Sequence, residues 1–89
     1  MGFDMMAIEW FVGLDDLERA AVLALHAGPL PTWVANSLRH ANIPTVSAEV
    51  NIGTGYRSAE FMMTMLSDFL TREAPALDVM LRALALPEA

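Results

Sequence analysis

Two histidines, His26 and His40, are the residues of this chain best suited to metal binding or proton transfer. They fall in different expected helices, and neither belongs to an H-E-x-x-H or similar ligand spacing. The chain contains no cysteine, which excludes disulfides and thiolate zinc sites. We therefore expect no metal site and no cofactor.

Nucleophilic and phosphate-binding patterns are equally weak. Ser37 precedes His40 by three residues, which allows a Ser–His contact on one helix face, but no orienting acid lies nearby in sequence. Asp15 and Asp16 are adjacent and point apart on a helix, so they do not form an acid–base pair. The glycine loop at residues 53–55 lacks the lysine of a phosphate-binding loop. The sequence predicts a protein that is not an enzyme.

Charge argues against nucleic acid as a partner. The net charge is −6, from eleven acidic residues against five arginines and no lysine. Five of the acids precede the first arginine, Arg19. Such a chain is repelled by phosphate backbones, and no basic cluster overcomes the repulsion. We therefore expect no nucleic-acid binding.

Hydropathy excludes a membrane span and points to a partner. No stretch approaches the roughly 20 uninterrupted apolar residues that cross a bilayer. Residues 1–12 are apolar but lack the basic start of a signal peptide, so we assign them to the fold and expect a cytoplasmic protein. The 89 residues form one domain, 1–89, whose folding buries about 64% of its surface. Because 55% of the residues are hydrophobic, some apolar surface stays exposed and indicates an interaction site.

The strongest helical pattern covers about residues 15–27. Asp15 and Glu18 have the spacing of a capping box, and Gly28 with the prolines that follow ends the helix. Further helices are expected over about 32–41, 58–73 and 75–87, with Thr32 and Ser58 as N-caps. Asn42 suits the left-handed position after the second of these four helices.

The segment 45–52 is ambiguous. Its apolar residues alternate with polar ones, as in a strand, but Thr45 after Pro44 also suits the start of a helix. A strand needs a partner, and residues 5–12 alternate poorly. We favour a short helix, and hence an all-α compact bundle of five or six helices. The alternative is an α+β fold with short strands at about 5–12 and 45–52. The expected core consists of Leu17, Ala21, Leu25, Val34, Leu38, Phe61, Met65, Phe69, Leu77 and Leu81.

The order of these elements over residues 14–87 resembles that of the bacterial effector-associated domains, which are similar to the death-like superfamily. The resemblance rests on the apolar positions of five segments, residues 14–25, 33–38, 43–50, 61–66 and 77–87. It implies a non-catalytic adaptor that joins a sensor or scaffold to an effector through like-with-like contacts in a bacterial defence or conflict system. We accordingly expect a protein partner, homotypic or a related helical domain, and a homo-oligomer.

Separated charges and adaptable apolar residues mark the expected interface. Acids of the first helix could meet arginines of a second copy, and Trp33 or neighbouring methionines could supply an apolar seam. The interface residues are Asp15, Asp16, Glu18, Trp33, Arg39, Arg57, Met62, Met63 and Arg72.

Two alternatives stay open. One is an acidic phage or antitoxin-like inhibitor that masks a basic partner. The other is a helix-turn-helix transcriptional regulator with its turn at residues 27–32, although that turn holds two prolines and the following helix has one arginine, Arg39.

Overall fold

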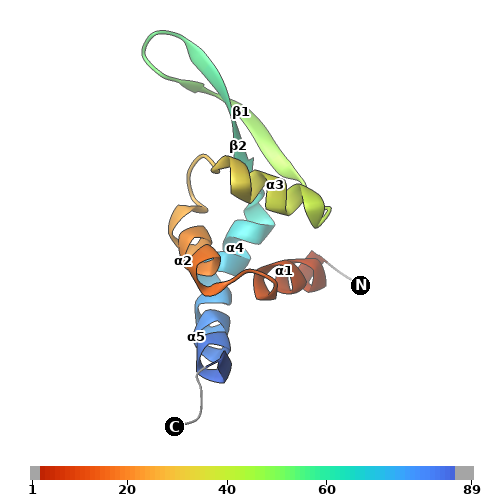
Figure 1. The fold of residues 1–89 in the computed structure, drawn as a ribbon. Helices are drawn as coiled ribbons and strands as arrows, with labels where there is room; N and C mark the ends of the chain where they lie inside the picture. Colours follow the sequence, from red (N-terminus) through yellow and green to blue (C-terminus); the bar gives the residue numbers. More distant parts are fainter. Residues whose placement is uncertain (1–2, 86–89) are drawn as a thin grey trace.

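The computed structural model describes residues 3–85, which form five helices and one β-hairpin. The elements in chain order are α1 (Phe3–Val12), α2 (Asp16–Leu25), α3 (Thr32–His40), β1 (Thr45–Asn51), β2 (Tyr56–Met62), α4 (Thr64–Arg72) and α5 (Ala74–Ala85). Figure 1 shows the hairpin projecting from one end of the molecule and α5 from the other. The helices α1 to α4 lie between these two projections.

The start of α2 confirms the predicted capping box. The Glu18 backbone N–H donates to Asp15 Oδ1 at 2.7 Å, and the Asp15 N–H donates to Glu18 Oε1 at 3.0 Å. Two orphan donors of the first turn are thereby satisfied. Asn42 has a φ of 60°, which confirms the left-handed position predicted after α3. Thr32, predicted as an N-cap, is instead the first residue of α3, and Pro31 is the N-cap.

The all-α prediction is wrong, because residues 45–51 form β1. The missing strand partner is Tyr56–Met62, which pairs antiparallel with β1 from Asn51↔Tyr56 to Thr45↔Met62. Most of this partner lies in the segment predicted to be a helix from Ser58, but the helix begins at Thr64. The alternative fold was right about a strand at 45–52 and wrong about one at 5–12, which lies in α1.

A tight loop makes the hairpin possible. Gly53 and Gly55 have φ values of 87° and 155°, which side chains rarely tolerate. The Gly53 N–H donates to Asn51 Oδ1 at 2.8 Å, and the Ile52 N–H donates to the Gly55 carbonyl at 3.0 Å. These contacts reverse the chain and align the alternating residues of both strands.

One face of the hairpin is mostly apolar and the other is polar. On the first, Val46 lies opposite Phe61 and Ala48 opposite Ala59, with Arg57 opposite Val50. On the second, Ser47 lies opposite Glu60. The Leu30 N–H donates to the Glu60 carbonyl at 2.8 Å. This bond ties β2 to the connection between α2 and α3.

The core lies where α1, α3 and α4 meet. Phe11 and Phe69 pack edge to face with ring centroids 6.1 Å apart. The core residues are Ala7, Trp10, Phe11, Leu14, Val22, Val34, Leu38, Ile43, Met62, Leu66, Phe69, Leu70 and Ala74.

The predicted core was right for Val34, Leu38 and Phe69, which are buried. Ala21, Phe61, Leu77 and Leu81 are half-buried. The prediction was wrong for Leu17, Leu25 and Met65, which are exposed, and Leu17 is 83% exposed. The helices α2 and α4 each bury a narrower stripe than their apolar residues suggest, centred on Val22 and Leu66.

The molecule is elongated. Its Cα radius of gyration is 14.6 Å, and its extents are 55 × 31 × 22 Å. A compact chain of this length has a radius of about 12 Å. Among residues 3–85, no helix combines the length and hydrophobicity needed to cross a membrane.

Candidate functional site

The most distinctive surface is formed by the exposed side of α3 and the adjoining hairpin, here called the α3–hairpin surface. It comprises Trp33, Asn36, Arg39 and His40 on α3 and Arg57 on β2, all of them exposed. Val34, Ala35 and Leu38 on the same helix are buried, so the polar residues face outward. The hairpin follows α3 directly and projects beyond it (Figure 1).

Arg39 occupies the centre of this surface. Its Nη1 donates to Asn36 Oδ1 at 2.6 Å, and its Nη2 forms an ion pair with Glu60 Oε1. Thr45 Oγ1 donates to the other oxygen of Glu60 at 3.0 Å. Because the pair is largely exposed, water screens it and the guanidinium can exchange Glu60 for another anion at little cost.

A groove of about 390 Å³ runs between α3 and the hairpin. Arg39 and Arg57 bring positive charge to it, and Glu60 brings negative charge. Its lining residues are Pro29, Leu30, Thr32, Ala35, Arg39, Val50, Ile52, Arg57, Ser58, Ala59 and Glu60.

Charge is distributed unevenly along the chain. Residues 20–62, which hold most of α2 together with α3 and the hairpin, contain two arginines, Arg39 and Arg57, and two acids, Glu49 and Glu60. This part of the chain is formally neutral, so the net charge of −6 falls entirely on the remainder. The segment that contains the α3–hairpin surface therefore carries no formal net charge.

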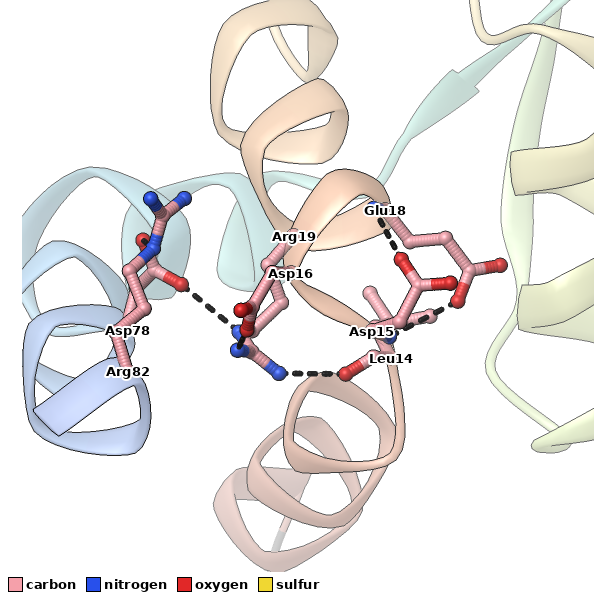
Figure 2. Close-up of polar contacts among 7 residues, drawn as sticks. All are labelled: Leu14, Asp15, Asp16, Glu18, Arg19, Asp78 and Arg82. Carbon is pink, nitrogen blue, oxygen red and sulfur yellow. Dashed lines mark hydrogen bonds and ion pairs between the residues drawn. The ribbon is translucent and has the colours of Figure 1, made fainter. Parts of the chain in front are cut away.

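A second polar cluster joins α2 to α5, as Figure 2 shows. Arg19 is buried, and its Nε donates to Asp78 Oδ1 at 2.8 Å. Its Nη1 donates to the Leu14 carbonyl at 2.5 Å, and its Nη2 pairs with Asp16. Arg82 Nε donates to the second oxygen of Asp78 at 3.1 Å. This cluster fixes α5 against the first turn of α2.

The environment of Asp78 has opposing effects on its acidity. Burial would raise the pKa of the Asp78 carboxyl, but hydrogen bonds from Arg19 and Arg82, with their positive charges, lower it below its usual value. The carboxylate is therefore charged at neutral pH and holds both arginines.

The predicted interface residues do not form one surface. Asp15 and Glu18 cap α2, Asp16 pairs with Arg19, and Arg72 is exposed on α4. Met62 is buried in the core and Met63 is half-buried, so the expected methionine surface is mostly internal. Trp33, Arg39 and Arg57 do belong to the α3–hairpin surface.

Sequence reasoning missed Asn36 and Asp78. Asn36 stands three residues before Arg39, a spacing that places both on one helix face. Asp78 stands four before Arg82, the spacing of a helical ion pair, although its buried partner Arg19 is 59 residues away. The sequence spacing could have indicated the Asn36–Arg39 contact. For Asp78 the spacing could have indicated its contact with Arg82 but not its contact with Arg19.

His26 and Ser37 have structural partners, whereas His40 is exposed at the end of α3. Trp10 Nε1 donates to Ser37 Oγ at 2.8 Å, so Ser37 is engaged with α1 rather than with His40. His26 Nδ1 lies 2.7 Å from Ser67 Oγ. Within residues 3–85 no group of three histidines or carboxylates is placed to hold a metal ion.

Comparison with known proteins gives no relative for the chain: no family model, no curated protein and no solved structure matches it.

Proposed function

We propose that this chain is a cytoplasmic helix-turn-helix regulator that binds double-stranded DNA, with α3 as the recognition helix and the hairpin as a wing beside it. The observation that supports this is the succession α2, connection, α3 and hairpin, in which the Leu30–Glu60 bond links the hairpin to the connection. The connection, residues 26–31, is longer than the 3–4-residue turn of most such motifs.

The dimensions and side chains of α3 suit the major groove. An α-helix with its side chains is about 10–12 Å across, which fits the major-groove width of about 12 Å. The nine residues of α3 give it a length of about 14 Å. The Asn36 amide can read adenine and the Arg39 guanidinium can read guanine by paired hydrogen bonds. Arg57 is exposed on β2, and we assign it a phosphate contact.

The distribution of charge along the chain bears on the expected repulsion between DNA and a protein of net charge −6. Our expectation of no nucleic-acid binding used the net charge of the whole chain, whereas residues 20–62 are neutral. The Arg39–Glu60 pair keeps the guanidinium in place without DNA and weakens non-specific attraction to phosphate. Binding should therefore depend on base contacts more than on charge.

The test begins with selection of duplexes from a random library at low salt, because the site is unknown. The best duplex is then titrated by fluorescence anisotropy. Arg39→Ala and Asn36→Ala should each weaken binding about tenfold or more, since one paired base contact contributes about 1–3 kcal/mol. Arg72→Ala, an exposed arginine on α4, is the matched control and should bind like the wild type. Failure of the selection to enrich any duplex would rule the proposal out.

A protein-binding adaptor is the second candidate, and the hairpin favours it. Val46, Ile52 and Tyr56 are exposed there, and two-stranded sheets have open edges to which an extended peptide can add. Tyr56→Ser should abolish capture of such a partner from the host and leave DNA binding by Asn36 and Arg39 intact.

A further inference from the structure

The groove between α3 and the hairpin carries a positive charge that the protein does not neutralise. Arg39 in the groove is paired with Glu60, whose other oxygen accepts from Thr45 at 3.0 Å. Arg57 also lines the groove and is exposed, but within residues 3–85 it forms no ion pair. Among the described residues that line the groove there are thus two cations and one anion, a balance that suits a ligand with a single negative charge.

The outer edge of β2 adds a backbone donor to this groove. The Leu30 N–H approaches from outside the hairpin and donates to the Glu60 carbonyl at 2.8 Å, so the backbone polar groups of Glu60 face away from β1. In an antiparallel pair this direction repeats at every second residue, so the Ser58 N–H faces the same way. The bond from the Ile52 N–H to the Gly55 carbonyl agrees with this alternation. Because Ser58 lines the groove, its N–H and its hydroxyl are donors for a ligand there.

Most of the remaining lining is apolar. Val50 lies directly opposite Arg57 in the hairpin, so an apolar side chain and a cationic one are neighbours. The groove volume of about 390 Å³ falls within the range of roughly 300–1,000 Å³ that is usual for small-molecule sites. Such sites combine apolar walls with a few polar groups that orient the ligand. The apolar lining residues are Pro29, Leu30, Ala35, Val50, Ile52 and Ala59.

We propose that this groove binds a small organic acid with one carboxylate and an apolar body. The carboxylate accepts from the Arg57 guanidinium, which can donate two parallel hydrogen bonds to it, and from the Ser58 N–H. The apolar body lies against Val50 and Ile52. A neutral ligand would leave the charge of Arg57 unmatched, and a ligand with several negative charges would be repelled by Glu60.

The ligand site has a consequence for DNA binding. Arg57 is the residue to which the proposed function assigns a phosphate contact, so an acid bound there competes with DNA for it. This competition rests on the proposed function, whereas the ligand site itself does not.

NMR spectra of the isotope-labelled full chain, titrated without DNA, test the ligand site. The probes are hexanoate, octanoate and phenylacetate. At least one of them should shift the backbone amide signals of residues 57–60 to saturation. The matching amide of that acid, which has the same body and no charge, should bind about tenfold or more weakly, because it loses the charge-assisted hydrogen bonds. No saturable shift with any of the three acids, or equal binding of acid and amide, would overturn the proposal.

Two arginine variants locate the site. Arg57→Gln should weaken binding of the acid about tenfold or more, with unchanged circular dichroism. Arg72→Gln on α4 is the matched control, since that arginine is also exposed, and it should bind the acid like the wild type. Equal losses in the two variants would overturn the assignment to the groove.

An anisotropy measurement separates the ligand site from the proposed function. The acid should release the selected duplex from the wild type. Retention of the duplex by a chain whose groove is saturated with acid would contradict the phosphate contact of Arg57, while the NMR result would still support the ligand site.

Discussion

At the scale of single residues, the tie between Arg19 and Asp78 determines how α5 sits on α2. Arg19 is a buried cation whose donors reach Asp78, Asp16 and the Leu14 carbonyl. A buried charge that loses its partner carries an uncompensated desolvation cost. The tie therefore acts more as a positional constraint than as a source of net stability.

Asp78→Ala should destabilise the fold by about 3–5 kcal/mol, because it leaves Arg19 buried without its main partner. Urea unfolding followed by circular dichroism measures the change. Asp68→Ala on α4 is the matched control, since that aspartate is exposed, and its effect should stay within about 0.5 kcal/mol. Equal effects of the two substitutions would contradict the role given to Asp78.

Stability should fall in acid partly through Asp78. Its folded pKa lies below the usual value, so its contribution is complete above the unfolded pKa of about 3.9 and is lost as pH falls through the folded pKa. Thermal unfolding from pH 7 to pH 2 should show this loss in the wild type. Asp78→Asn should show less of it, and an identical pH profile would contradict the assignment.

At the scale of elements, the rotation of α4 about its axis decides which of its apolar residues enter the core. Phe69 is 7% exposed and packs on Phe11, whereas Met65, four residues earlier, is 56% exposed. Phe69→Ala should therefore cost about 3–5 kcal/mol of unfolding free energy. Met65→Ala should cost less than about 0.5 kcal/mol, as surface substitutions do. Chemical denaturation of both variants measures the two free energies of unfolding. A large loss of stability in Met65→Ala would contradict the exposed position of Met65.

The hairpin should depend on its glycine turn. Gly53→Ala forces a side chain into a positive-φ conformation and should destabilise the turn by about 1–2 kcal/mol. Gly28→Ala is the matched control, because no atom lies within 4 Å of the added Cβ and its φ is not in that region. Hydrogen exchange of β1 and β2 amides should accelerate about 5–30-fold in the first variant only. Unchanged exchange would show that the turn tolerates the strain.

At the scale of the whole molecule, charge is concentrated away from the proposed DNA surface. This surface has two arginines, Arg39 and Arg57, so the chain makes at most two phosphate contacts even where Arg39 faces the backbone instead of a base. The slope of the logarithm of the association constant against the logarithm of the salt concentration should therefore be about −2 or shallower. Anisotropy titrations on the selected duplex measure it. A much steeper slope would mean that other groups carry the binding.

The sequence by itself determined the local features of the fold. The Asp15–Glu18 capping box, the left-handed Asn42 and the alternation of residues 45–52 depend on neighbouring residues, and the structure contains all three. It also predicted an excess of apolar surface, because that follows from size and composition. These properties need no knowledge of distant contacts.

Only the tertiary structure decided which partners those local features meet. The strand at 45–51 needed β2, whose residues also suited a helix start, and the pairing resolved the ambiguity in favour of a hairpin. The Arg19–Asp78 tie joins residues 59 positions apart, and the two faces of α5 are distinguished only by where the body packs. Helical periodicity shows that a stripe is apolar, whereas long-range packing decides whether the same chain covers it.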